Sequence, residues 1–510
     1  MGCVWFGACR AAIASPLIAS LVIAAGCASH QVTTADDVAA NLHARTAAAA
    51  RVTGVVAVAG ADADLPVGVG LDDGVTADEA VALALWNNAA FQASVSQLGF
   101  ARADLLDAGM LANPVFSLLF PWGPKQFEAT VRWPAEVLWE RPRRVAAASL
   151  SANAAAERLV QNGLDLVASV RVAHADFAFA VDRERVMGEA ATLLARIDTL
   201  TKSRFAAGDI GELEARAATV DAARARQDAE RAAHDITIAR ERLRQLVGLS
   251  SAATLNVSPS AAAATSSSAS TPAPTATPAS ASAQAPATGP APAPVLTSIS
   301  TPTSTPTQAP PSAMAACGEP GALLREALAA RPDLRAAELT IEAATARLGW
   351  ERSRVLTLTA VLDANGEGRS GFEAGPGVDF SLPIFNRNQG GRARAHAELR
   401  RAAAAYVALQ QQVALELREA SAQLDQARQS SEAWKTTITA PLEANLAAAE
   451  RSFALGDTSY LFVLENSRRL TDARLRAREL DADQARAHAR LERALGRSCS
   501  QPSQEPPRAR

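Results

Sequence analysis

Small and apolar residues recur three and four positions apart over two long stretches, a pattern that predicts two long helices with coiled-coil seams. In the second stretch the seam residues are Leu417, Ala420, Leu424, Ala427, Ser431, Trp434 and Ile438. Side chains at these spacings share one helix face and pack against a partner helix. The predicted helices cover 143–203 and 392–451, roughly 90 Å each at 1.5 Å per residue. Pro441 is expected to kink or break the second one.

Each long helix leads into a short motif that occurs twice in the chain. Phe205-Ala-Ala-Gly-Asp-Ile-Gly-Glu-Leu213 returns as Phe453-Ala-Leu-Gly-Asp-Thr-Ser-Tyr-Leu461, at an offset of 248 residues. Gly-Asp favours a tight turn, because glycine tolerates positive φ and the Asp side chain can bond neighbouring amides. Return helices are predicted over 212–247 and 460–495, each ending at a glycine. The chain is therefore interpreted as a duplicated unit built on a helical hairpin.

Each unit also holds a shorter helix and two strands ahead of its hairpin. The shorter helices are predicted over 78–108, with Thr76 or Asp78 as the cap, and over 321–354. The predicted strands cover 114–121, 126–133, 355–365 and 377–383, with a glycine-rich turn over 366–375. Polar bends are expected at 141–144 and 386–392. Four strands cannot close a barrel alone, whereas three chains would supply twelve strands and leave no bare edge.

Composition agrees with long, thin helical packing. Aromatic residues make up only 5% of the 510 residues, and alanine, the best helix former, is abundant. The net charge of −3, with basic and acidic residues interleaved along helices, gives no support for nucleic-acid binding. The fold class is thus predicted as mainly α with a small β part.

The N-terminus predicts export. Residues 1–26 read as a signal peptide, whose apolar run is too short to span a membrane. Ala24-Ala-Gly-Cys27 resembles a lipobox, which makes Cys27 the expected lipidation site. The expected domains follow in order: a lipidated tether over 27–75, a first repeat over 76–255, a disordered Ala/Ser/Thr/Pro linker over 256–318, a second repeat over 319–498, and a polar tail over 499–510.

Two cysteines remain beside Cys27 once the signal peptide is removed, Cys317 and Cys499. An exported chain sits in an oxidising compartment, where they could form a disulfide, and two unpaired thiols are the open alternative. No Cys-x-x-Cys or His–Cys cluster occurs, so no metal site is predicted. No nucleophile, base or phosphate-binding motif stands out either, so an enzyme and a cofactor are not expected.

Taken in order, these features resemble the TolC family of outer-membrane efflux proteins. The resemblance rests on the lipobox, the tandem helix–strands–hairpin units, the Phe-Ala-x-Gly-Asp tips and Leu111-Ala-Asn-Pro114. Leu382-Pro-Ile-Phe-Asn-Arg-Asn-Gln-Gly390 is most similar to the CzcC-type branch, associated with divalent-metal efflux. The resemblance implies a homotrimer with a twelve-stranded barrel in the outer membrane and a helical tunnel through the periplasm. It further implies lipid anchoring in that membrane and a tripartite pump completed by a periplasmic adaptor and an inner-membrane transporter.

The resemblance also assigns roles to the hairpin ends. The tips expected to contact the adaptor are Gly208, Asp209, Leu213, Gly456, Asp457, Ser459 and Leu461. The aperture would be lined by Glu214, Phe462 and Glu465. Phe462 stands where family members often carry an acidic residue, so an apolar constriction is an equal alternative to a charge ring.

Three functions remain to be told apart. The first is an efflux duct for divalent metal cations, and the second is the same duct for drugs or other small molecules. The third is a structural or adaptor coiled-coil lipoprotein of the envelope. An adaptor would carry one hairpin flanked by small β domains, and a structural lipoprotein would need neither the strand pairs nor the Gly-Asp tips.

Overall fold

The computed structural model describes residues 32–52, 65–66, 69, 74–120, 122, 127–249, 320–367 and 371–499. The predicted signal peptide, Cys27, the linker, Cys317 and nearly all of the polar tail lie outside these residues. The elements are α2 (Ala35–Thr46), α3 (Ala77–Asn87), α4 (Ala89–Gly109), β1 (Val115–Leu119), β2 (Phe127–Pro134), α5 (Val137–Ala207), α6 (Glu212–Val247), α8 (Pro320–Ala330), α9 (Pro332–Ser353), β3 (Leu358–Glu367), β4 (Gly371–Phe380), α10 (Gln389–Trp434), the π-helix η3 (Lys435–Thr439), α11 (Ala440–Leu455) and α12 (Tyr460–Leu495).

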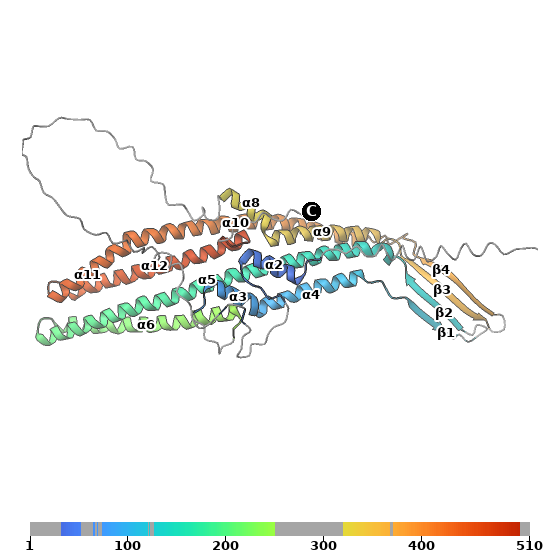
Figure 1. Cartoon of the computed structure of the whole chain (residues 1–510). Coiled ribbons are helices and arrows are strands. Elements are labelled where there is room, and N and C mark those ends of the chain that lie inside the picture. The colour runs from blue at the N-terminus through green and yellow to red at the C-terminus, as the bar shows by residue number, and fades with distance from the viewer. Residues whose placement is uncertain are drawn as a thin grey trace, which may run out of the picture.

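The molecule is a long body with the sheet at one end and two helical hairpins at the other (Figure 1). Hairpin 1 is α5 with α6, and hairpin 2 is α10–η3–α11 with α12. The shorter helices α2, α3, α4, α8 and α9 surround the middle of the body, near the roots of the hairpins (Figure 1). Among the described residues, no helix has both the length and the apolar character needed to cross a membrane.

The four strands form one antiparallel sheet in the order β1-β2-β3-β4, which joins the strand pairs of both repeats. Directly paired residues point to the same face of the sheet, so the register shows on which face each side chain lies. One face is apolar and contains Phe116, Leu118, Phe127, Ala129, Val131, Trp133, Leu358, Ala360, Leu362, Ala364, Phe372, Ala374, Pro376, Val378 and Phe380. The opposite face carries most of the polar residues of the sheet, which are Ser117, Glu128, Thr130, Arg132, Thr359, Asp363, Asn365, Glu367, Glu373 and Asp379, together with the apolar Val115, Leu119, Pro134 and Val361.

Polar side chains on the second face bond to one another across the strands. The Thr130 hydroxyl donates to Asp363 Oδ1 at 2.9 Å, and Asn365 Nδ2 donates to Asp363 Oδ2 at 2.9 Å. The sheet is therefore two-sided, with one face suited to an apolar surrounding and the other to a polar one.

The prediction for the fourth strand was wrong at its start. β4 begins at Gly371, six residues before the expected Gly377, so much of the expected glycine-rich turn is strand. β3 likewise runs to Glu367 and begins at Leu358, later than expected. Glycine in this sheet makes room for a ring, because a Cβ on Gly366 would lie 2.4 Å from Cε1 of Phe127.

The polar bend expected at 141–144 was also wrong. These residues lie in the first turns of α5, which starts at Val137 and continues through Pro142 for 71 residues. The corresponding bend of the second repeat exists, since α10 starts only at Gln389, after Asn388 at φ 57°. Both return helices have the predicted bounds, Glu212–Val247 and Tyr460–Leu495.

Pro441 widens the helix instead of breaking it. The five-residue π-helix Lys435–Thr439 precedes it, and α11 begins at Ala440 with the proline in its first turn. Proline has no N–H to offer the carbonyl of Thr437, so the regular i→i+4 pattern cannot run unbroken through this point, and a wider turn lies just before the proline.

Both shorter helices are interrupted where one continuous helix was predicted. α3 ends at Asn87, and Asn88 starts α4 by accepting a hydrogen bond from the Phe91 amide at 2.9 Å. In the second repeat Arg331 separates α8 from α9, because the following Pro332 disfavours helical conformation in the residue before it.

The expected extended tether contains a packed helix. Thr34 caps α2 in a capping box with Asp37, and Val38 and Leu42 are completely buried. Leu42 lies against Gly163 of α5, where a Cβ would come within 2.6 Å of its side chain. Arg45 Nη1 donates to the carbonyls of Ala330 at 2.7 Å and Gly496 at 3.0 Å. α2 thus joins the first repeat to two helix ends of the second.

Candidate functional site: the paired hairpin tips

Both hairpin tips are built by the same backbone bonds. Gly208 has φ 83° and Gly456 has φ 90°, so each long helix ends in the left-handed region that glycine favours. The amide of Asp209 donates to the Arg204 carbonyl at 2.9 Å, and that of Asp457 donates to the Ser452 carbonyl at 2.9 Å. This bonding satisfies carbonyls left open at the helix ends and fixes the sharp turn predicted from Gly-Asp.

The seven residues expected at the tips are all exposed in the chain. Leu213 is 84% exposed and Leu461 is 70% exposed, with Leu455 beside them at 79%. Large apolar side chains at a turn with no cover are typical of a surface that meets another protein. Ser459 is the N-cap residue of α12, but its side chain makes no capping hydrogen bond.

Two of the three residues expected at the aperture directly follow tip residues, Glu214 after Leu213 and Phe462 after Leu461, and Glu465 lies about one turn further along α12. Phe462 is 53% exposed, Glu214 is partly buried, and Glu465 is exposed and pairs with Arg469 at 2.8 Å. One chain holds these positions on two different helices, α6 and α12.

The ends of the two hairpins share a hydrophobic core. It combines Leu194, Ile197, Ala218 and Ala222 of hairpin 1 with Leu446, Ala449, Phe453, Tyr460, Val463, Leu464 and Leu470 of hairpin 2. The hairpins of one chain therefore pack against each other near their tips, consistent with their neighbouring positions in Figure 1.

Asp221 of α6 is the polar link between the hairpins in this region. Its carboxylate accepts a hydrogen bond from the Tyr460 hydroxyl at 2.9 Å and forms an ion pair with Arg468 at 2.8 Å. Burial, and then the bond to Asp221, raise the pKa of Tyr460 above its usual range, so the phenol stays protonated as the donor. The sequence analysis did not select this group. Tyr460 is one of only two tyrosines in the chain, which was the available signal.

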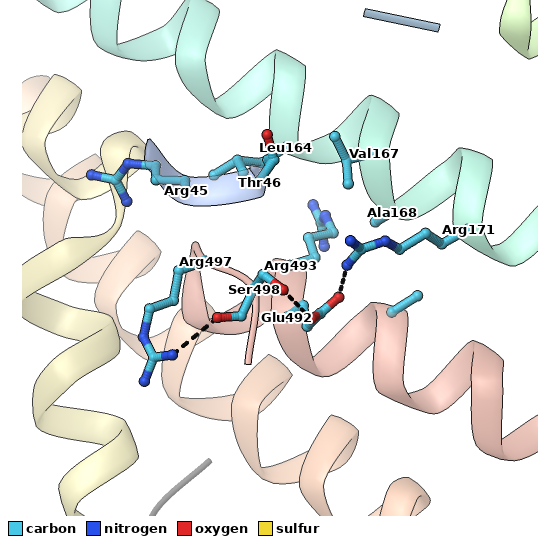
Figure 2. Close-up of a pocket in the computed structure, with 11 residues that line it drawn as sticks. Arg45, Thr46, Leu164, Val167, Ala168, Arg171, Glu492, Arg493, Arg497 and Ser498 are labelled. Carbon is cyan, nitrogen blue, oxygen red and sulfur yellow. Dashed lines mark hydrogen bonds and ion pairs between the residues drawn. The ribbon is translucent and has the colours of Figure 1, made fainter. Parts of the chain in front are cut away.

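A second polar cluster lies at the roots of the hairpins, around Glu492 of α12 (Figure 2). Glu492 is buried and pairs with Arg171 of α5, which also reaches Asp78 of α3 at 3.1 Å. Its Oε1 accepts from the Ser498 hydroxyl at 2.8 Å and the Cys499 amide at 2.9 Å. The adjoining cavity of about 20 Å³ has room for a water molecule and not for a larger ligand.

This cluster does not fit a metal ion. Ligand atoms of His488, Glu492 and Cys499 lie within 4.8 Å of one another. However, Cys499 is in a disulfide and offers no thiolate, while Glu492 already accepts from Arg171, Ser498 and Cys499. Cys317, the expected partner of Cys499, lies outside the described residues. The cluster therefore has a structural role between α3, α5 and α12.

The elongated helical body, its two-sided sheet and its paired tips define the fold of outer-membrane efflux channels. Residues 323–497 match the family model described as "Outer membrane efflux protein". A membrane protein of Pseudomonas aeruginosa has the same fold, with a TM-score of 0.62, 19% identity, and coverage of 85% of this chain and 97% of that one. CusC, whose crystal structures concern folding and transmembrane channel formation, gives a TM-score of 0.61 at 18% identity, covering 85% of this chain and 95% of its own.

Among curated proteins, the chain is similar to the cobalt-zinc-cadmium resistance protein CzcC of Cupriavidus metallidurans. The two are 26% identical over 428 residues, which cover 83% of this chain and 90% of the relative. The resemblance to the TolC family of outer-membrane efflux proteins, and to CzcC within it, is therefore confirmed.

Proposed function

We propose that this protein is the outer-membrane exit duct of a tripartite efflux pump and that its cargo is divalent metal cations. The two-sided sheet carries the proposal. Its apolar face suits lipid and its polar face suits a water-filled lumen, as in barrels that span the outer membrane. Four strands are half of the smallest closed barrel, so closure requires further copies of the chain.

Three copies would form a twelve-stranded barrel with no free strand edge, and the six hairpins would continue it as a tunnel. The tips, with Gly208, Asp209, Leu213, Gly456, Asp457, Ser459 and Leu461, would meet the periplasmic adaptor. Glu214, Phe462 and Glu465 would line the aperture, where the exposed ring of Phe462 supports an apolar constriction. An inner-membrane transporter supplies the energy, and the duct itself needs no catalytic group.

Lipidation of Cys27 belongs to the same proposal, as does a disulfide between Cys317 and Cys499. The disulfide would join the linker side of the second repeat to the end of α12. Replacing Cys317 by Ser should then leave Cys499 reactive to maleimide in the folded chain. A Cys499 that stays unreactive in this variant would contradict the pairing.

The metal cargo rests on similarity to CzcC, whose name specifies cobalt, zinc and cadmium resistance. The test is deletion of the gene in its host, complementation with the full chain, and growth on graded zinc, cobalt, cadmium, nickel and copper salts and on antibiotics. Sensitivity to metals alone supports the proposal, whereas sensitivity to antibiotics alone keeps the duct and replaces the cargo. No phenotype in a host without a second duct supports a structural lipoprotein instead.

A matched pair of variants tests the tip as the docking end. Leu213→Ser removes an 84% exposed apolar side chain next to the turn, and Val220→Ser removes a 50% exposed one two turns further along α6. We expect Leu213→Ser to reduce resistance and Val220→Ser to retain it, at equal amounts of protein in the outer membrane. Equal resistance in both variants would contradict docking through the tip.

A further inference from the structure

The two copies of the tip motif use their phenylalanines differently. Phe205 and Phe453 occupy equivalent positions in the repeat. Phe453 is 4% exposed and belongs to the core shared by the hairpins, whereas Phe205 is 44% exposed. The same residue in the same local backbone is therefore a core residue in one tip and a surface residue in the other.

Arg204 of hairpin 1 contacts the buried phenylalanine of this pair. Its guanidinium carbon lies 4.4 Å from the centroid of the Phe453 ring, within the range of a cation–π contact. Its Nη2 also donates a hydrogen bond to the Phe453 carbonyl, in the last turn of α11. Carbonyls at the C-terminal end of a helix carry partial negative charge, which favours a cation there. One side chain of hairpin 1 thus covers the ring and bonds the helix end of hairpin 2.

The second repeat cannot return this contact. The position equivalent to Arg204 is Ser452, whose short neutral side chain has neither the charge nor the reach of a guanidinium. Phe205 consequently has no arginine over it from the other tip, and it stays exposed at the end of hairpin 1. Leu213, Leu455 and Leu461 add further uncovered apolar area at the two tips.

We propose that Arg204 fixes the two tips of one chain in register, so that they form a single docking surface with unequal halves. In this surface Phe453 is held in the core by Arg204, and Phe205 is the aromatic anchor that enters the partner. The occupant is the adaptor of the proposed function, and the chemistry that fits these tips is an apolar protein face, since exposed aromatic and leucine side chains gain most from burial against one. This inference rests on the proposed function, in which the tips contact the adaptor.

The register is tested by the distance between the tips in the purified full chain. Spin labels on Ala206→Cys and Ala454→Cys, both exposed positions, report it by pulsed electron resonance, with labelled chains diluted into unlabelled ones. We expect a narrow distribution that broadens in Arg204→Ala and is largely restored in Arg204→Lys, which keeps a charged donor. Arg196→Ala, on an exposed arginine two turns earlier in α5, is the matched control. An unchanged distribution in Arg204→Ala would overturn the proposal.

The unequal roles are tested by replacing each phenylalanine by alanine. We expect Phe205→Ala to lose metal resistance at an unchanged unfolding temperature, and Phe453→Ala to lower that temperature. Full resistance in Phe205→Ala, with a complementing wild-type chain, would overturn the anchor and leave the duct intact. If the wild-type chain restores no resistance, the proposed function fails instead, and the distance measurement still decides the register.

Discussion

Two glycines that end helices of hairpin 1 share a left-handed backbone but differ in their surroundings. At Gly208, with φ 83°, nothing lies within 4 Å of the position a Cβ would take. At Gly248, with φ 74°, a Cβ would lie 2.6 Å from the Asn87 carbonyl oxygen, where α6 ends against the break between α3 and α4. The first glycine meets only a conformational requirement, while the second also allows two backbones to approach closely.

We expect Gly208→Ala to cost about 1 kcal/mol, the usual penalty for alanine in the left-handed region. Gly248→Ala should cost about 3 kcal/mol or more, because backbone must also move. Denaturant unfolding of the two variants measures both values. Equal losses would show that the contact with Asn87 is not tight in solution.

His174 of α5 gives the stability a dependence on pH. It is 7% exposed, and its Nε2 lies 3.1 Å from the Val75 carbonyl, which makes Nε2–H the donor. Burial lowers the pKa of His174, against the opposing effects of the bond to Val75 and the charge of Asp78. The unfolded chain therefore takes up a proton near its ordinary pKa of about 6.5, at a pH where the folded chain does not.

Stability should consequently fall as the pH drops through about 6.5 and below. His174→Gln keeps a donor for Val75 but cannot titrate, so its unfolding free energy should fall less between pH 7.5 and 5.5. The expected difference between the two chains is about 1 kcal/mol. Identical pH profiles would show that His174 is not the responsible group.

At the scale of elements, the helices of the second repeat are joined by one buried arginine. Arg331, between α8 and α9, is 2% exposed and pairs with Asp333 at 2.6 Å and with Glu416 of α10 at 2.9 Å. It also donates to the Ala494 carbonyl of α12 at 3.3 Å. The residue that breaks one predicted helix thus ties its second part, α9, to α10 and α12.

Removing Arg331 takes a buried cation away from Asp333 and Glu416, so Arg331→Ala should cost about 3 kcal/mol. Arg335→Ala on the same helix removes a 52% exposed arginine that pairs with Glu338 at 3.0 Å, and should cost no more than about 1 kcal/mol. Thermal unfolding of both variants shows which of the two loses more stability. A loss smaller than that of Arg335→Ala would mean that α9, α10 and α12 do not depend on the bonds of Arg331 for their packing.

The two hairpins differ as elements even though their sequences repeat. α5 is one helix of 71 residues, whereas the equivalent stretch of hairpin 2 is interrupted by η3. Pro142 lies near the start of α5, and Pro441 lies deep within its hairpin. The position of a proline along a long helix, and not its presence, therefore decides whether the bonding pattern changes.

At the scale of the whole molecule, the faces of the sheet predict opposite effects for neighbouring residues. Leu362 lies on the apolar face, opposite Val131 and Pro376, and Val361 lies on the other face, opposite Arg132 and Gly377. If the apolar face meets lipid, Leu362→Arg should cost about 2–4 kcal/mol near the middle of the bilayer. Val361→Arg should be tolerated because it would face the lumen.

Membrane fractionation and detergent-resistant oligomers on gels measure this difference. We expect Val361→Arg in the outer membrane as an oligomer, and Leu362→Arg largely absent from it. The reverse order would place the polar face toward lipid and contradict the proposed barrel. Equal insertion of both variants would show that this part of the sheet does not contact the bilayer.

The sequence by itself determined the parts that depend on neighbours along the chain. The Gly-Asp tips and both return helices follow from turn chemistry and from spacing along one helix, and the structure has them where they were predicted. The seam of the second long helix is buried from Leu417 to Ser431, whereas Trp434 and Ile438 are only partly buried. The two strand pairs were also predicted, although β4 begins earlier than expected, because glycine in a strand resembles glycine in a turn.

Only the tertiary structure decided what depends on residues far apart. The break at Asn88 makes room for the end of α6, whose Leu246 carbonyl accepts from Asn88 Nδ2 at 2.8 Å. The stretch expected as a tether folds into α2 because Val38 and Leu42 find a core on another helix. Phe205 and Phe453 occupy equivalent positions of the sequence repeat. Only the folded hairpins bury Phe453, with Arg204 over its ring, and leave Phe205 exposed. Local patterns specify turns and helix faces, whereas burial depends on which surfaces the folded chain brings together.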